Sequence, residues 1–244
     1  MSRRARIVVV LPALAGLAAL LAWSFTGLPG FGSFRGPYGI LLNRVATPER
    51  HMTNVVNATT YDYRSFDTMG EEFILFAAVI GIVLLLREDD RDRRAEDRVR
   101  SEMVRSGGGL TVGIGVLVGL WVVAFGFVTP GGGFQGGVAV ASAVLLLFAA
   151  VGYRAWSTLG NETVLDPIEG LGAGGYVAVG LAALASGLPF LTNVLGPGIA
   201  GTLWSGGSAA FVNWSAGIEV AAAMLLLYAE FLEAHAVPVM RGAS

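Results

Sequence analysis

Long apolar runs alternate with short polar stretches along the whole chain. A helix that crosses a membrane needs about twenty mostly apolar residues, because each residue advances it by about 1.5 Å. Six runs reach or approach this length, at about residues 7–23, 71–86, 110–128, 136–153, 171–191 and 213–232. Apolar and polar positions do not alternate within the runs, as they would in membrane strands. The pattern predicts an all-α fold, a polytopic membrane bundle of about six transmembrane helices.

Three local signals bear on where single helices begin and end. The second run is short unless it starts at Thr68, and Thr68-Met69-Gly70-Glu71 has the spacing of a capping box, which opens helices. The fifth run contains Pro189, which is expected to kink or end its helix. Asp166 and Glu169, just before that run, are expected to favour the positive end of the helix dipole.

The composition supports a membrane location and excludes several classes of protein. Hydrophobic residues make up 54% of the 244 residues and charged residues 14%, whereas soluble domains have about 25% charged residues. The chain has no cysteine, and its two histidines, His51 and His235, lie far apart in sequence. We therefore expect no disulfide, no metal centre and no cofactor. A net charge of −2 without a basic stripe gives no sign of a nucleic-acid partner.

The arginines predict the orientation of the bundle. They precede the first run, fill the connection between the second and third runs, and follow the fourth and sixth runs. Because arginine-rich loops stay in the cytoplasm, both termini are predicted to be cytoplasmic. The long first connection, residues 25–67, is an exception with four arginines. An arginine-rich start followed by an apolar run also fits a cleaved signal peptide, but the length of the run and the absence of an Ala-x-Ala site favour a retained helix.

A charged segment divides the six runs into two groups. Residues 87–106 mix arginine with aspartate and glutamate, which is typical of a solvated cytoplasmic linker. This predicts a two-span segment at residues 1–86, a four-span domain at 107–233 and a C-terminal tail at 234–244. The serine and glycines of residues 106–109 are expected to form a hinge.

Three glutamates are candidates for a role inside the membrane. Glu219 lies six residues into the last run, where a lone carboxylate costs about 3 kcal/mol and is expected to face protein or water. Glu219 would either belong to an ion pathway or, when protonated, stabilise the bundle by a hydrogen bond to a neighbouring helix. Glu71 and the adjacent Glu72 open the second run, so Glu71 is either a helix cap or a proton acceptor. No nucleophile–base pair or phosphate loop is evident, and no enzymatic activity is expected.

A glycine-rich turn joins the third and fourth runs. It consists of Thr129, Pro130, Gly131, Gly132, Gly133, Phe134, Gln135, Gly136 and Gly137. Its Gly-x-Gly-x-x-Gly spacing matches the dinucleotide-binding pattern, but that pattern works only between a strand and a helix. Glycines in membrane helices instead permit a tight reversal and close helix approach. Close packing, within this chain or with partner chains, is therefore the expected role of the turn.

These motifs resemble one known family. The glycine turn, the helix after it and the later Gly217-Ile218-Glu219-Val220 sequence resemble the MnhB-like domain, the B-type component of the Mrp-type multisubunit Na⁺/H⁺ antiporters, over residues 107–233. Residues 53–57 and 63–71, which include Asp67, look like the C-terminal tail of the A-type component of the same antiporters. The chain thus resembles an A-type tail fused to a B-type domain. Small membrane subunits of membrane-bound hydrogenases share this module. Ala58-Thr59-Thr60-Tyr61 departs from the family, which is usually aliphatic there.

The resemblance implies a function and partners. It implies a non-catalytic membrane subunit of a Na⁺/proton antiporter in a bacterial or archaeal cell membrane, which would form a complex with other Mrp-type subunits. Na⁺ and H⁺ would be the transported ions, with Glu71, Glu72 and Glu219 shaping their path. Two alternatives are a membrane subunit of a related redox-driven complex and a purely structural scaffold.

Overall fold

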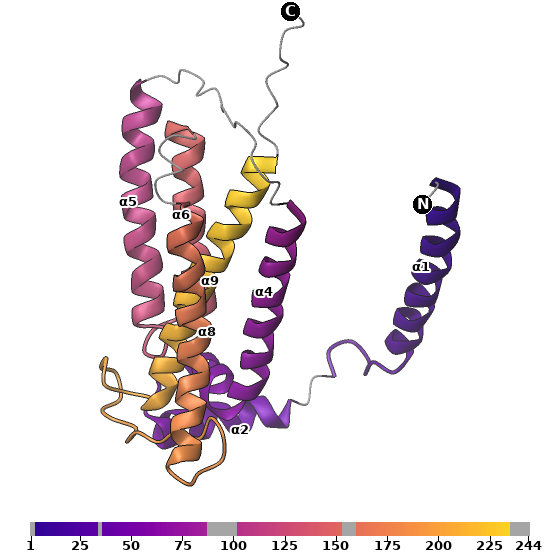
Figure 1. The fold of residues 1–244 in the computed structure, drawn as a ribbon. Coiled ribbons are helices and arrows are strands. Elements are labelled where there is room, and N and C mark those ends of the chain that lie inside the picture. Colours follow the sequence, from indigo (N-terminus) through magenta and orange to yellow (C-terminus); the bar gives the residue numbers. More distant parts are fainter. Residues whose placement is uncertain (1–2, 34–35, 87–101, 153–159, 235–244) are drawn as a thin grey trace, which may run out of the picture. The chain divides into compact units, whose positions relative to one another are not determined.

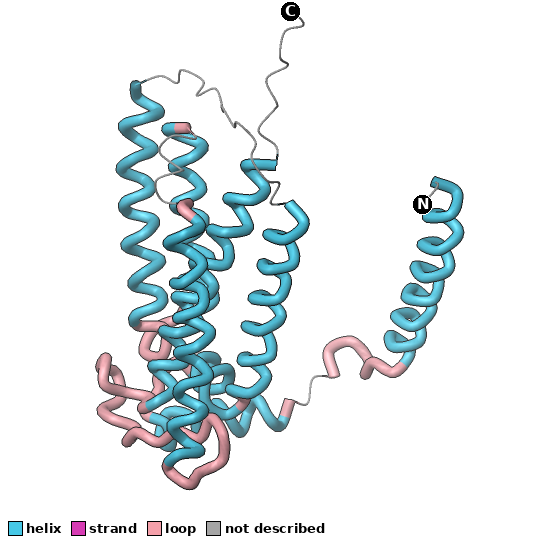
Figure 2. Tube along the Cα trace, viewed as in Figure 1, coloured by secondary structure: helices cyan, strands magenta, loops and turns pink. Residues whose placement is uncertain are grey.

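The computed structural model describes residues 3–33, 36–86, 102–152 and 160–234, and within these ranges the chain is helical and forms no strand (Figures 1 and 2). The helices are α1 (Arg3–Thr26), α2 (Pro37–Arg50), α3 (Val55–Ala58), the π-helical turn η1 (Thr59–Tyr63), α4 (Ser65–Leu86), α5 (Glu102–Ala124), α6 (Gly133–Val151), α8 (Glu162–Ala185) and α9 (Ser208–Ala234). The predicted all-α fold is confirmed. Most of the predicted linker and tail lies outside the described residues.

Five helices are long and apolar enough to cross a membrane. Their spans are Ser65–Leu86, Glu102–Ala124, Gly133–Val151, Thr163–Ala185 and Ser208–Leu232. The chain is therefore a polytopic helical membrane protein, as predicted. The first predicted run is also helical, but its apolar segment, Leu11–Thr26, is shorter than these spans. A membrane crossing by α1, its retention and the cytoplasmic position of both termini stay predictions.

The chain divides into two compact units, Met1–Leu41 and Leu42–Ser244, and the second holds the five-helix bundle. Within this bundle α9 lies at the centre, in contact with α4, α6 and α8 (Figure 1). Buried residues make up 61% of its apolar window, against 11% in α4 and α5. Large apolar side chains of those outer helices, such as Ile74 and Leu84, are exposed as they would be to lipid. A polar residue on α9 is therefore shielded from the surroundings of the bundle more strongly than one on α4 or α5.

Glycines set the spacing of the central helices. A Cβ built at Gly136 on α6 would lie 2.7 Å from the backbone nitrogen of Val123, and one built at Gly137 would lie 2.9 Å from the carbonyl oxygen of Gly217 on α9. Real Cβ atoms essentially never come this close to other atoms, so these positions hold backbones in direct contact. The close approach expected of the glycine turn occurs within this chain.

Three predictions about helix limits are wrong. Helix α4 begins at Ser65, so Thr68 lies inside it, and the Thr68 hydroxyl donates to the Thr60 carbonyl (2.7 Å) instead of capping the helix. Residues 106–109 are part of α5 and form no hinge. Helix α8 begins at Glu162, which places Asp166 and Glu169 inside the helix. It ends at Ala185, before Pro189, in agreement with the prediction that this proline limits the helix.

Candidate functional site

The centre of the site is Glu219, on the most buried helix of the bundle. Its side chain has no exposed surface, which confirms the predicted burial. Gly172 of α8 makes this possible, because a Cβ there would lie 2.5 Å from the backbone nitrogen of Glu219. With only a hydrogen atom at Gly172, helices α8 and α9 close over the carboxyl group. Glu219 is thus sealed between helices rather than placed in an open channel.

Glu72 of α4 brings a second carboxyl group to the same place. It is 2% exposed, and its carboxyl group interacts directly with that of Glu219. No N–H or O–H donor of the described residues reaches any of their four carboxylate oxygens. Two adjacent carboxylates without donors or counter-charges repel each other strongly in a medium of low polarity. The pair therefore has to hold a proton between its members or a cation beside them.

A third carboxyl group continues this row on α8. Glu169 is 4% exposed and lies within electrostatic range of Glu219. One of its oxygens, Oε1, has no hydrogen-bond partner in the described part of the chain. The prediction that Glu169 only serves the helix dipole is wrong, because α8 starts seven residues earlier than Glu169 and the side chain points into the bundle. Asp166, one turn before it, is exposed.

Two buried tyrosines flank Glu72. Tyr61 of η1 is 4% exposed, and its hydroxyl accepts a hydrogen bond from the Phe134 backbone N–H (3.4 Å). Burial and the charge of Glu72 raise the pKa of Tyr61, so it stays a neutral hydroxyl with a proton to donate. Tyr176 of α8 is 1% exposed and donates to the Ser65 carbonyl (2.9 Å). Sequence reasoning missed both, because tyrosines in a membrane protein usually mark the interface.

The other predicted glutamate, Glu71, is exposed and lines a cavity of about 180 Å³. The cavity lies between η1, the start of α4 and the glycine turn, and its polar lining includes Asn57, Thr60, Tyr61, Thr68, Glu71 and Gln135. The structure therefore separates the two adjacent glutamates of the sequence. Glu72 faces the buried pair, and Glu71 faces the cavity, with Tyr61 in electrostatic contact with both.

Two asparagines hold the glycine turn beside this cavity. The Asn54 side chain donates to the carbonyl oxygens of Gly126 (2.7 Å), Thr129 (3.0 Å) and Gly131 (3.1 Å). Asn213 of α9 accepts from the Gly133 N–H (2.9 Å) and donates to the Val123 carbonyl (2.8 Å). Gly131, at φ +151°, could not take a side chain without meeting Val122. The turn is thus a fixed part of the site, tied to the segment before α4.

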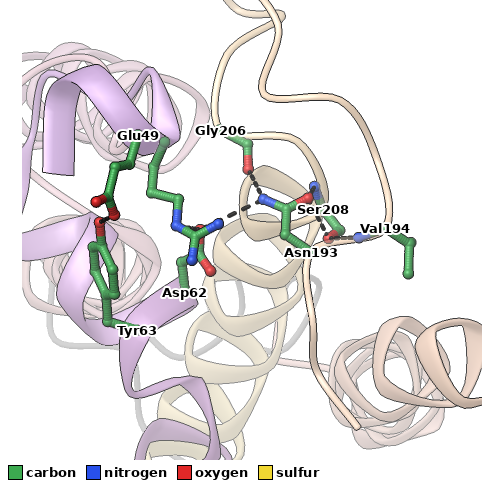
Figure 3. A network of polar contacts seen from close by, with 8 residues as sticks. Glu49, Asp62, Tyr63, Asn193, Val194, Gly206 and Ser208 are labelled. Carbon is green, nitrogen blue, oxygen red and sulfur yellow. Dashed lines mark hydrogen bonds and ion pairs between the residues drawn. The ribbon is translucent and has the colours of Figure 1, made fainter. Parts of the chain in front are cut away.

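A polar network lies at the same end of the bundle (Figure 3). Arg50 Nε lies 3.2 Å from the Asp62 carboxylate, Tyr63 donates to Glu49 (2.6 Å), and the Asn193 amide accepts from the hydroxyl (2.8 Å) and backbone N–H (2.9 Å) of Ser208. Burial raises the pKa of Asp62, and Arg50 opposes this shift. The network borders a larger cavity, of about 420 Å³, which Asp67 and Arg64 also line as an exposed ion pair. Asp67, predicted from the family motif, thus lies at the surface.

Metal-binding groups of three or more His, Asp or Glu side chains do not occur among the described residues. The sequence identified Glu71, Glu72, Glu219 and the glycine turn as candidates, and it gave Glu169 only a role at the helix dipole. It did not identify Asn57, Asn213, Tyr61 and Tyr176 as site residues; each is a polar side chain next to or inside an apolar run.

Comparison with known proteins shows which families and solved structures this chain resembles. Residues 103–226 match the family described as a domain related to the MnhB subunit of the Na⁺/H⁺ antiporter, and residues 2–106 match MbhE, a family of MBH subunits. A chain of the membrane-bound sulfane sulfur reductase, an archaeal respiratory membrane complex, is 29% identical, with a TM-score of 0.69 over 93% of this chain and 98% of that one. A chain of the Mrp complex from Dietzia sp. shares the fold, with 20% identity and a TM-score of 0.64 over 100% of this chain and 27% of that one.

The chain is a membrane subunit of the type found in Mrp and MBH complexes. It belongs to the family of domains related to the MnhB subunit of the Na⁺/H⁺ antiporter, which covers more than half of its length. An uncharacterized protein of Methanocaldococcus jannaschii is 30% identical over 175 residues, and this chain spans 64% of that relative's length. The resemblance found in the sequence is confirmed, and the similar complexes have several subunits, which supports assembly with other chains.

Proposed function

We propose that this chain is a non-catalytic subunit of a Na⁺/H⁺ antiporter complex and that ions pass along Glu71, Glu72 and Glu219. The observation that carries the proposal is the Glu72–Glu219 pair, buried and without a donor from the described residues. The two groups can share a proton with each other, but no other donor of the described residues stabilises them. A pair that requires a proton or a cation is suited to exchanging one for the other.

The row of carboxyl groups supports a path through the bundle. Glu71 faces the cavity at the glycine turn, Tyr61 lies within electrostatic range of both Glu71 and Glu72, and Glu169 lies within electrostatic range of Glu219. The groups come from η1, α4, α9 and α8, so the path would run between helices and not along one. In this proposal Na⁺ binding to the pair displaces its proton, so that one ion is exchanged for the other.

The test is neutralisation of the pair within the assembled complex. We expect Glu219→Gln and Glu72→Gln to lower Na⁺-driven proton exchange in membrane vesicles by about tenfold or more, since groups that transfer protons contribute factors of this size or larger. Glu102→Gln, the same change at the exposed start of α5, should leave exchange unchanged. Assembly is followed by co-purification of the other subunits. Normal exchange in a fully assembled Glu219→Gln complex would refute the ion path and favour a scaffold role.

A second function is supported by one specific observation. The similarity to the sulfane sulfur reductase chain covers 98% of that chain, so the same module could serve a redox-driven complex. Purification of the native complex decides between the two, because a redox-driven complex would contain other chains that hold iron–sulfur clusters. The carboxyl pair would keep its role in either case, and only the source of energy would differ.

A further inference from the structure

The connection between α8 and α9 contains a hairpin of fixed shape, at residues 197–206. Its ends are joined by a hydrogen bond from the Gly206 N–H to the Pro197 carbonyl (2.9 Å). Nearer the tip, the Ile199 N–H donates to the Trp204 carbonyl (2.8 Å). The backbone therefore holds the side chains of this hairpin in a defined arrangement, which a loose loop would not do.

The base of the hairpin is attached to the bundle. The Asn193 side chain donates to the Gly206 carbonyl (2.8 Å) and accepts from the N–H of Ser208, the first residue of α9 (2.9 Å). On the other side of the hairpin, the ring nitrogen Nδ1 of His51 lies 2.5 Å from the Gly198 carbonyl oxygen. These contacts fix the position of the hairpin relative to the start of α9.

The outward surface of the hairpin is apolar. The Ile199 side chain is 69% exposed, Trp204 78% and Leu203 41%. The two hydroxyl groups of the hairpin are used within it, because Thr202 donates to the Ile199 carbonyl (2.8 Å) and Ser205 donates to the Thr202 carbonyl (2.8 Å). A group of large apolar side chains that is exposed in this way marks contact with another protein or with a membrane.

A cavity of about 250 Å³ lies between the hairpin and the first two turns of α9. Its larger lining side chains are Leu195, Leu203, Trp204, Phe211 and Trp214. Phe211 and Trp214 belong to the apolar span Ser208–Leu232 and lie about 5–9 Å along the helix from its start. The hairpin thus lies beside the end of a membrane span and not beyond it (Figure 1). This is the depth at which tryptophan is enriched in membrane proteins.

The polar groups of the hairpin favour lipid over a protein as its neighbour. A protein interface usually contains about one hydrogen bond per 100–200 Å², whereas residues 170–218 have no charged side chain and both hydroxyls of the hairpin donate internally. Contact with hydrocarbon requires polar groups to be satisfied internally in this way. The remaining polar side-chain group of residues 197–206 is the indole of Trp204, which suits the boundary between headgroups and hydrocarbon.

We propose that the 197–206 hairpin is a lipid-contact element that places Ile199, Leu203 and Trp204 in the membrane beside the start of α9. The cavity behind it then binds the hydrocarbon chain of one membrane lipid, because its larger lining side chains are all aliphatic or aromatic. The hairpin would thereby fix the depth of the helix that carries Glu219. The inference is independent of the proposed ion path, which contains no group of the hairpin.

The absence of cysteine from the chain permits a direct test of what surrounds the hairpin. Ile199→Cys introduces a single thiol for a nitroxide spin label, and the assembled complex is reconstituted into vesicles of phosphatidylethanolamine and phosphatidylglycerol. Power saturation compares collisions of the label with oxygen, which enters hydrocarbon, and with a nickel chelate, which stays in water. We expect oxygen to dominate, at a depth that spin-labelled lipids place just below the headgroups.

Glu102→Cys, at the exposed start of α5, is the matched control, and there we expect the nickel chelate to dominate. If the nickel chelate also dominates at residue 199, the hairpin faces water. If residue 199 is protected from both reagents, a partner subunit covers it. Either result would overturn the proposal.

A photoreactive lipid tests the cavity separately. A phospholipid with a diazirine on its acyl chain is activated in the reconstituted complex, and its adducts are mapped by mass spectrometry. We expect adducts at the cavity wall that decrease several-fold in Gly196→Leu, which fills the cavity at a position where a Cβ meets nothing within 4 Å. Gly113→Leu in α5, equally open but outside the cavity, should retain them. Absent adducts in the wild type, or undiminished adducts in Gly196→Leu, would refute lipid binding in the cavity.

Discussion

At the scale of single residues, the site depends on amides as much as on carboxylates. Asn213 joins α9 to the glycine turn, to α5 and to Asn57 with three hydrogen bonds, and its side chain is fully buried. Asn54 ties the same turn to the segment before α4. The carboxyl groups supply the chemistry, and these two amides fix the walls around it.

We therefore expect Asn213→Ala to destabilise the protein by about 2 kcal/mol, because three hydrogen bonds are lost and each contributes roughly 0.6–1 kcal/mol in a membrane protein. The measurement is reversible unfolding in mixed detergent micelles. Asn213→Asp is no milder than alanine, because it loses the donor to Val123 and places a carboxyl group in a fully buried site. Equal stability of wild type and Asn213→Ala would show that this amide has no structural role.

At the scale of elements, the close contact of α6 with α9 determines whether the carboxyl groups can meet. Gly137 lies against the backbone of α9, and a Cβ there would lie 2.9 Å from both the Gly217 oxygen and the Val220 side chain. Any side chain at this position would push α9 away from α6 and disturb the helix that carries Glu219. Helix spacing and site geometry are thus coupled.

The substitution Gly137→Ala is expected to lower stability by about 1–3 kcal/mol, the usual cost of overpacking. Gly113→Ala in α5 is the matched control, since nothing lies within 4 Å of a Cβ at that position. Alanine is also the better helix former, so Gly113→Ala should leave stability unchanged or raise it slightly. Thermal unfolding of the two purified variants compares them. A neutral Gly137→Ala would mean that the helices separate without cost.

At the scale of the whole molecule, the cavities and polar networks gather at one end of the bundle. The glycine turn follows the last residue of α5, Ala124, and the start of α5, Glu102, lies at the opposite end of that helix (Figure 1). The arginine distribution predicts that the turn faces the outside of the cell. The cavity beside the glycine turn would then lie on the side of the external medium.

Single cysteines test this orientation because the natural chain has none. In intact cells a membrane-impermeant maleimide should label Gln135→Cys, whereas Glu102→Cys should react only after the membrane is permeabilised. Both positions are exposed in the structure, so a difference in labelling reports the side of the membrane. Labelling of Glu102→Cys in intact cells would reverse the predicted topology and place the cavity in the cytoplasm.

The sequence alone determined the membrane class, the approximate positions of the helices and the burial of Glu219. These features depend on local composition, since a run of apolar residues is recognisable without knowing its neighbours. Helix limits were less well predicted, as the false cap at Thr68 and the false hinge at 106–109 show. In both cases the helix extends beyond the local signal.

Only the tertiary structure decided which polar groups meet. The partnership of Glu72 with Glu219, the approach of Glu169 and the hydrogen bond of Asn57 to Asn213 all join helices that are far apart in the sequence. Local pattern contains no information about such pairs, because they depend on how the helices pack, including how closely glycine faces let α6, α8 and α9 approach. The carboxyl groups were visible in the sequence, and their arrangement into a shared site came from the packing of the helices.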